Sequence, residues 1–234
     1  MQVAHAKSDV TGLGPRSAET RSRMIHAAIE VFGALGFEGA STRVLADRAG
    51  VNLAAIPYHF GGKRELYLAA AQVIADHTRD IIDPVIAKLR DIDRADGVRR
   101  IDEALSSFFR LLGVGVEPQA WVSFVVRCEH DADDAFRMIY EQAVGRFAQA
   151  LADTVAELVE GNSDEESLRV RVTIVLASIM NFRTLRNMML STLGWDHLDP
   201  ERLEQLERAI KRFALGVLLS TSVGDGTAAS QSTP

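Results

Sequence analysis

The chain has 234 residues, of which 47% are hydrophobic and 25% are charged, a composition that excludes global disorder and allows a well-buried core. Its formal net charge is −6, but residues 1–64 carry eight Lys and Arg against five Asp and Glu, whereas the remainder carries 18 against 27. The single cysteine, Cys128, excludes an internal disulfide. No secretory signal or membrane-length apolar run is visible, so we expect a cytoplasmic protein without a membrane partner.

Apolar residues recur at helical spacing along the chain, and no strand-like alternation is visible. Residues 1–18 carry no such periodicity and are expected to form a disordered tail. The first helix is expected over residues 18–35, because apolar side chains recur there at steps of three and four, at Met24, Ala28, Val31 and Leu35. Gly36 follows at once and is suited to cap this helix.

Two short helices separated by a glycine turn are expected next. Ser41 or Thr42 is suited to cap the first of them, which ends near residue 49 before Gly50. Asn52 is a good N-cap for the second, expected over residues 53–59. Two such helices joined by a tight turn are typical of a helix-turn-helix, whose second helix enters the major groove of DNA.

The remaining chain predicts a larger helical body. A long helix is expected from Lys63 towards Asp83, where Pro84 should bend or stop it. Later helices are expected over residues 97–112, 118–128, 134–159, 164–193 and 200–219, which gives about nine helices and an all-α fold. We therefore expect a three-helix DNA-binding domain over residues 19–64, an effector-binding and dimerisation domain over residues 65–220, and a disordered tail over residues 221–234.

Groups that can contact DNA phosphates gather around the expected helix-turn-helix. Free amides at a helix N-terminus attract phosphate, and Lys63 adds a positive charge at the start of the long helix. The candidate DNA-binding residues are Thr20, Arg21, Thr42, Arg43, Asn52, Leu53, Ala54, Ala55, Tyr58, His59 and Lys63. The reading helix itself is apolar. Its leucine and alanines can touch thymine methyl groups but cannot make the bidentate hydrogen bonds that distinguish one base from another. We therefore expect Arg43 and DNA shape to carry much of the sequence preference.

The stretch over residues 21–66, about a fifth of the chain, resembles the TetR family of regulators. It contains VFGALGFEGAST, VLADRAGVN and the family's HF-x-x-K-x-x-L signature from His59 to Leu66. One departure is Pro57, which stands where the family usually has tyrosine; the tyrosine is at position 58. Pro57 should make the third helix short or distorted, which puts the phosphate role of Tyr58 in doubt.

The IPYHFGGK form and residues 124–136 resemble a subgroup with a CerR-type body. In that stretch Cys128 stands where the subgroup usually has glutamate, and Ala132 where it has proline. The family resemblance implies a homodimer, an effector pocket among the middle helices, and release from a palindromic DNA operator when a small hydrophobic or amphipathic effector binds. A repressor is the default expectation, and activation stays open.

Two sets of apolar residues are candidates for dimerisation and effector binding. The seams on the last two long helices either bury in their own chain or pair with a second copy, and the resemblance favours pairing of Val175, Ile179, Phe182, Met189, Leu206, Ile210, Phe213 and Val217. The bulky residues of the middle helices either form plain core or line the pocket. The candidate pocket residues are Phe108, Phe109, Leu112, Trp121, Phe124, Val125, Arg127, Phe147, Met180 and Arg183.

Three alternative hypotheses compete with a DNA-binding regulator. An enzyme is disfavoured because the chain lacks a nucleophile elbow, a glycine-rich phosphate loop and zinc-binding motifs, and we expect no cofactor. A metal sensor would use the acidic turn at residues 129–134, which we instead interpret as solvated and helix-capping. A scaffold without DNA binding would leave the phosphate donors around His59 and Lys63 unexplained.

Overall fold

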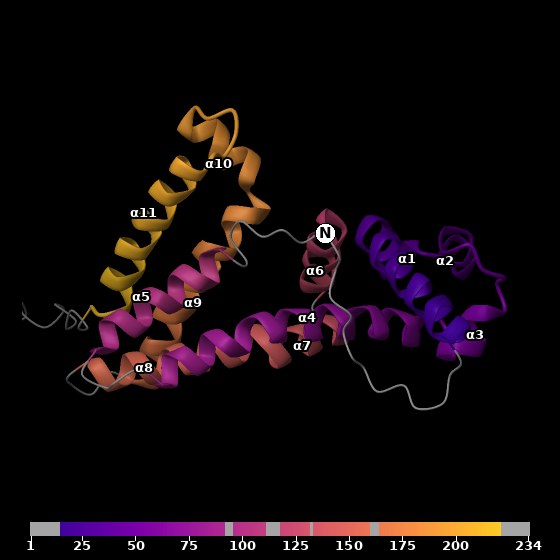
Figure 1. The fold of residues 1–234 in the computed structure, drawn as a ribbon, viewed down its shortest axis with the longest axis horizontal. Coiled ribbons are helices and arrows are strands. Elements are labelled where there is room, and N and C mark those ends of the chain that lie inside the picture. The colour runs from indigo at the N-terminus through magenta and orange to yellow at the C-terminus, as the bar shows by residue number, and fades with distance from the viewer. Residues whose placement is uncertain (1–14, 92–95, 111–117, 132, 160–163, 221–234) are drawn as a thin grey trace, which may run out of the picture. The chain divides into compact units, whose positions relative to one another are not determined.

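The computed structural model describes residues 15–91, 96–110, 118–131, 133–159 and 164–220 (Figure 1). Within these ranges all regular elements are helices, which confirms the all-α prediction. The elements are α1 (Pro15–Gly39), α2 (Thr42–Ala49), α3 (Ala55–Phe60), α4 (Lys63–Asp91), α5 (Gly97–Phe108), α6 (Gln119–Asp131), α7 (Asp134–Ile139), the π-helical segment η3 (Tyr140–Val144), α8 (Gly145–Leu158), α9 (Glu165–Thr184), α10 (Arg186–Leu193) and α11 (Pro200–Leu218).

Among the described residues eleven α-helices replace the expected nine, because two expected long helices are interrupted. The π-helical segment η3 separates α7 from α8, and Leu185 separates α9 from α10 with φ −102° and ψ 23°. Residues 15–18, expected in the N-terminal tail, belong instead to α1, where Pro15 suits the first helical position. The rest of both expected tails lies outside the described residues.

Contacts divide the chain into two compact units. The first unit, here called the head, comprises Met1–Ala75 and Glu117–Ile139, so it contains α1 to α3, the first turns of α4, and α6 and α7. The second unit, the body, comprises Asp76–Val116 and Tyr140–Pro234. The boundary therefore falls within α4 and not before it, and α6 and α7, expected in the effector domain, pack with α1. The expected functional division at residue 64 stays a prediction.

The head is built around a close packing of α1 against α6. Phe32, Tyr67 and Phe124 meet in its core, with ring centroids 4.8 Å apart for the first pair and 5.1 Å for the last pair. Gly33 allows the two helices to approach: a Cβ atom there would lie 2.8 Å from the Ala120 carbonyl oxygen and 3.0 Å from the Phe124 nitrogen. These distances are shorter than side-chain contacts tolerate, so the interface requires glycine.

The body buries a second core between α4, α5, α8, α9 and α11. Phe108 and Phe147 stack at its centre with ring centroids 4.6 Å apart. Helix α4 continues through Pro84 as far as Asp91, so of the two expected outcomes, a bend or a stop, the stop does not occur. Proline removes one backbone hydrogen bond, but residues on both sides of it are buried, at Ile82, Val85, Ile86 and Leu89, and this packing offsets the loss.

An ion pair joins α11 to Arg110, two residues after the end of α5, within the body. Arg110 donates through Nε and Nη2 to the two carboxylate oxygens of Glu207, at 3.1 and 2.9 Å. Burial alone would raise the pKa of Glu207, but hydrogen bonds from Arg110 and Ser106 and the charge of Lys211 outweigh it and hold that pKa below its ordinary value. A carboxylate with a lowered pKa stabilises the fold above its ordinary pKa, and this contribution is lost as the pH falls through the lowered value.

None of the described helices is both long and apolar enough to span a membrane.

Candidate DNA interface

The helix-turn-helix forms as the sequence predicts, because each end of α2 is capped. Ser41 accepts a hydrogen bond from the Val44 amide through its hydroxyl, and Gly50 adopts φ 64° and ψ 41° to close the helix. Ala46 and Ile56 are buried between the two short helices. Because Ala46 is small, α2 and α3 can approach each other closely, and this contact holds α3 in place.

Helix α3 starts at Ala55, two residues later than expected, and Pro57 explains this start. A helix beginning at Leu53 would need Pro57 to donate to the Leu53 carbonyl, which proline cannot do. In the observed helix Pro57 falls in the first turn, where the backbone donors have no helical partner. Asn52 is therefore not the N-cap; its side chain accepts a hydrogen bond from the Ala54 amide at 3.0 Å and stabilises the turn.

The outward side of this element is apolar, as predicted for a reading helix. Leu53 is 51% exposed and Tyr58 is 80% exposed, whereas Ala55 is partly buried. A shallow surface depression of about 510 Å³ lies beside them, lined by Thr42, Asn52, Leu53, Ala54, Ile56, Pro57 and Gly62. None of these lining residues is charged, so this depression favours apolar or weakly polar groups.

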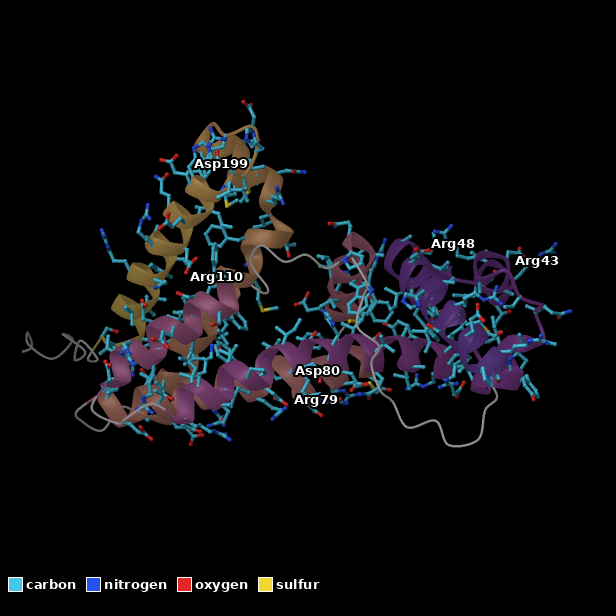
Figure 2. All side chains as sticks on the ribbon, in the orientation of Figure 1. Arg43, Arg48, Arg79, Asp80, Arg110 and Asp199 are labelled. Atoms are coloured by element: carbon cyan, nitrogen blue, oxygen red, sulfur yellow. The ribbon has the colours of Figure 1, made fainter. Side chains whose placement is uncertain are left out.

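Cationic side chains flank the apolar surface. Arg43 and Arg48 project from α2 (Figure 2). Arg48 is paired with Glu30 at 2.6 Å, whereas Arg43 is exposed and has no ion-pair partner among the described residues. An unpaired exposed guanidinium is the form best suited to bind a phosphate or a base edge. Arg43 therefore fits its expected role in DNA binding.

Three of the candidate DNA-binding residues make contacts within the head. Arg21 donates to the His59 carbonyl at 2.7 Å and lies over the Phe60 ring. The ammonium of Lys63 lies 4.4 Å from the centroid of the Phe37 ring. Thr20 donates its hydroxyl to the carbonyl of Arg16 at 2.9 Å. The sequence could not reveal these contacts, because each depends on packing between helices or on a chosen rotamer.

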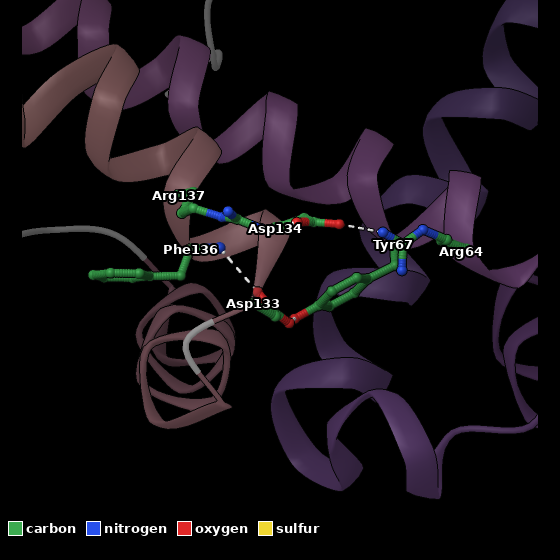
Figure 3. A network of polar contacts seen from close by, with 6 residues as sticks. All are labelled: Arg64, Tyr67, Asp133, Asp134, Phe136 and Arg137. Atoms are coloured by element: carbon green, nitrogen blue, oxygen red, sulfur yellow. Dashed lines mark hydrogen bonds and ion pairs between the residues drawn. The ribbon is translucent and has the colours of Figure 1, made fainter.

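A polar network, not expected from the sequence, joins the start of α4 to the turn before α7 (Figure 3). Tyr67 donates to Asp133 at 2.6 Å, and the other oxygen of this carboxylate accepts from the Phe136 amide at 3.0 Å and caps α7. Burial, followed by the hydrogen bond and charge of Asp133, raises the pKa of Tyr67, so the phenol stays protonated and donates. Asp134 pairs with Arg64 and with Arg137. These contacts attach α7 to the first turns of α4.

Asp133 and Asp134 of the acidic turn thus make contacts that hold α7 in place, and Cys128 is buried. Among the described residues no three His, Cys, Asp or Glu side chains are arranged to hold a metal ion. Burial raises the pKa of the Cys128 thiol to about 12, with a smaller contribution from the charge of Asp133. A thiol with such a pKa stays protonated near neutral pH and is a poor nucleophile.

The candidate effector residues are divided between the two cores. Phe124, Trp121 and Val125 belong to the head, where the exposed Arg127 donates to the Ala34 carbonyl at 3.3 Å. Phe108, Phe109 and Phe147 are fully buried in the body, and Met180 is at its surface. Leu112 and the side chain of Arg183 lie outside the described residues. The structure therefore does not gather the candidates into one cluster, and their effector role stays a prediction.

The candidate dimer seam mostly faces its own chain, and its role in dimerisation stays a prediction. Val175 and Ile179 are completely buried in the body core, so their side chains are not available to a second copy. Leu206 and Ile210 are buried there too, and Phe182, Met189 and Val217 pack against the same core. Only Phe213 of this set is exposed, at 47%. The exposed large apolar residues of α9 are Val170, Ile174 and Met180.

Taken together, a capped helix pair, an apolar reading surface and flanking cations define a helix-turn-helix DNA-binding regulator with an appended helical body. Comparisons with known proteins agree. Residues 24–70 match the family described as "Bacterial regulatory proteins, tetR family", and residues 98–218, more than half of the chain, match "HTH-type transcriptional dual regulator CecR, C-terminal domain". The chain belongs to the TetR family, with a C-terminal domain of the CecR type. This CecR domain is the subgroup expected above under the name CerR.

Curated relatives and solved structures support the same assignment. The HTH-type transcriptional dual regulator CecR of Shigella flexneri is 26% identical over 201 residues, which cover 83% of this chain and 89% of that protein. The HTH-type transcriptional activator FasR of Mycolicibacterium smegmatis is 29% identical over 167 residues, which cover 67% of this chain and 66% of that protein. The regulator FadR from Bacillus subtilis, solved in complex with stearoyl-CoA, has the same fold with a TM-score of 0.56 at 15% identity, covering 85% of this chain and 97% of that one.

Proposed function

We propose that this chain is a ligand-responsive transcriptional repressor that binds a palindromic DNA operator as a homodimer. The observation that carries the proposal is the exposed surface formed by Leu53, just before α3, and Tyr58 of α3, together with the exposed guanidinium of Arg43, which has no ion-pair partner among the described residues. Such a surface suits the major groove, where apolar side chains contact bases and cations contact the adjacent phosphates. The double-stranded operator would be read by two copies of the helix pair, about 34–36 Å apart or a multiple of that spacing.

The apolar depression beside Leu53 favours thymine as the base that is read. The thymine 5-methyl group is the apolar feature of the major groove, and the lining residues offer no charged group for guanine. Asn52, the one lining amide that could read adenine, uses its side-chain oxygen to accept from the Ala54 amide. We expect uracil in place of a contacted thymine to weaken binding about fourfold, because one buried methyl contributes about 0.8 kcal/mol. Titration of thymine and uracil operators by fluorescence anisotropy measures this.

The Leu53→Ala variant is the matched control for the uracil substitution, because it removes the apolar partner of the methyl group. It should bind the two operators with nearly equal affinity. An undiminished thymine preference in this variant, or no preference in the unmodified chain, would refute thymine reading through Leu53.

Dimerisation is proposed through the outward faces of α9 and α11. Most of the predicted seam is buried in its own chain, but its member Phe213 on α11 is about half exposed, as is a second stripe on α9 with Val170 and Ile174. A helix that is apolar on two sides needs a second partner for the side left in water. A copy related by a two-fold axis would cover this surface with the same surface of its own.

We propose that a small apolar or amphipathic effector shifts the position of α6 and α7. Both helices belong to the stretch matched by the CecR domain, yet they pack in the head, through Gly33 and through the Tyr67–Asp133 hydrogen bond. A displacement of these helices would therefore move the first turns of α4 and the helix pair next to it. A coupling of about 1–3 kcal/mol gives a five- to 150-fold change in operator affinity.

A reporter gene placed behind the DNA upstream of the chain's own coding sequence tests the repressor proposal. Expression of the chain should lower reporter output, and an effector found by thermal-shift screening of apolar compounds should restore it. The Arg43→Gln variant should leave output high. Unchanged output would contradict the DNA-binding proposal, and raised output would contradict repression and indicate an activator.

A further inference from the structure

Arg21 of α1 reaches the C-terminal end of α3, the reading helix. Its Nη1 donates to the His59 carbonyl oxygen at 2.7 Å, and its guanidinium carbon lies 4.1 Å from the centroid of the Phe60 ring. His59 and Phe60 are the last two residues of α3. One side chain therefore makes a hydrogen bond and a cation–π contact to the same end of this helix.

This anchor matters because α3 has only six residues. A helix of that length is not stable by itself in water, and its last carbonyl groups have no partner within the helix. A cation at the C-terminal end of a helix is favourable, and a planar guanidinium can bond a carbonyl while it stacks on a ring. At its other end α3 begins at Ala55, and its N-cap residue Ala54 makes no side-chain cap, so the contact from α1 is needed to fix the direction of the helix.

We propose that Arg21 is a positioning residue for operator binding: it holds α3 against α1 so that Leu53 and Tyr58 face the DNA. The sequence alone places Arg21 among the candidate DNA-binding residues. The structure engages its guanidinium inside the head instead, whereas the guanidinium of Arg43 is exposed and unpaired among the described residues. This inference rests on the proposed DNA-binding function.

Substitution by lysine separates positioning from phosphate binding, because it keeps the charge and removes the planar group. We expect Arg21→Lys to weaken operator binding about tenfold or more at every salt concentration, since lysine is not equivalent to arginine at a stacked, directional site. Its slope of log affinity against log salt should equal that of the unmodified chain. Arg43→Gln should instead make the slope shallower by about 0.9, the value for one lost phosphate contact.

Arg43→Lys is the matched control, because an exposed phosphate contact tolerates exchange of one cation for another; it should bind nearly as well as the unmodified chain. Phe60→Leu removes the ring without changing charge and should weaken binding in the same way as Arg21→Lys. The two losses should be less than additive in the double variant, since both break one contact.

Amide hydrogen exchange measures the position of α3 without DNA. Arg21→Lys should speed exchange of the Tyr58 and Gly61 amides, which donate to the carbonyls of Ala54 and Pro57, and leave that of the Leu45 amide in α2 unchanged. The proposal would be overturned if Arg21→Lys bound the operator with the affinity of the unmodified chain and left amide exchange unchanged. It would also be overturned if Arg21→Gln made the slope of log affinity against log salt shallower by the value for one phosphate contact and left amide exchange unchanged. If the unmodified chain bound no DNA, the proposed function would fail, while exchange would still decide whether Arg21 holds α3.

Discussion

Replacing Gly33 with alanine should lower the free energy of unfolding by about 1–3 kcal/mol, the usual cost of overpacking a tight contact. The new Cβ atom would lie 2.8 Å from the Ala120 carbonyl oxygen and 3.0 Å from the Phe124 nitrogen. Both are backbone atoms of α6, so relief requires the two helices to move apart. Urea unfolding followed by circular dichroism, at a fixed protein concentration, measures the loss.

The sign of this effect is the informative feature, because glycine-to-alanine changes inside helices ordinarily stabilise by about 1 kcal/mol. Gly39→Ala is the matched control: its position is exposed, and an added Cβ would make only an ordinary contact, 3.4 Å from the Cβ of Leu35. It should not lose stability. A Gly33→Ala variant as stable as the unmodified chain would show that α1 and α6 do not pack this closely.

Phe213→Glu is expected to separate the dimer without unfolding the chain. Phe213 is 47% exposed in α11, so a charged side chain there meets water in the monomer, but it would be buried without a partner at the proposed dimer surface. Losing the second head removes the gain from two linked sites, so operator affinity should fall about 10²- to 10⁴-fold. Size-exclusion chromatography with light scattering, together with anisotropy titrations, measures both effects.

Ala156→Glu is the control for this substitution. Ala156 is an exposed residue of α8, outside the proposed surface, and the substitution adds the same charge. It should stay dimeric and bind the operator normally. A Phe213→Glu variant that remains dimeric and retains operator affinity would contradict dimerisation through α9 and α11.

Local sequence signals predicted the helix-turn-helix well, because its ends are set by capping. Ser41 and Gly50 act within a few residues of where they stand, so the bounds of α2 followed directly. Pro57 predicted a short α3 but not the residue at which it starts. That start is set by the need to place the proline in the first turn of the helix. The stop considered at Pro84 does not occur, because packing of α4 in the body core outweighs one missing backbone hydrogen bond.

Properties that depend on which face of a helix is covered could not be predicted from one sequence. Helix α9 is apolar on two sides, and periodicity alone cannot tell the side that packs at Val175 from the side exposed at Ile174. Likewise the sequence shows that Arg21 and Arg43 are cations near DNA, but only the fold shows that Arg21 contacts His59. The Tyr67–Asp133 contact joins residues 66 positions apart and had no local signal.

The most direct test of the account is the salt dependence of binding to a DNA fragment from upstream of the chain's own coding sequence. Binding through 6–10 phosphate contacts should weaken about 10³- to 10⁵-fold between 50 and 200 mM salt, and a scrambled fragment should bind far more weakly at every salt concentration. Equal affinity for both fragments, or an affinity that does not change with salt, would mean that the surface formed by α2, α3 and the start of α4 does not recognise an operator.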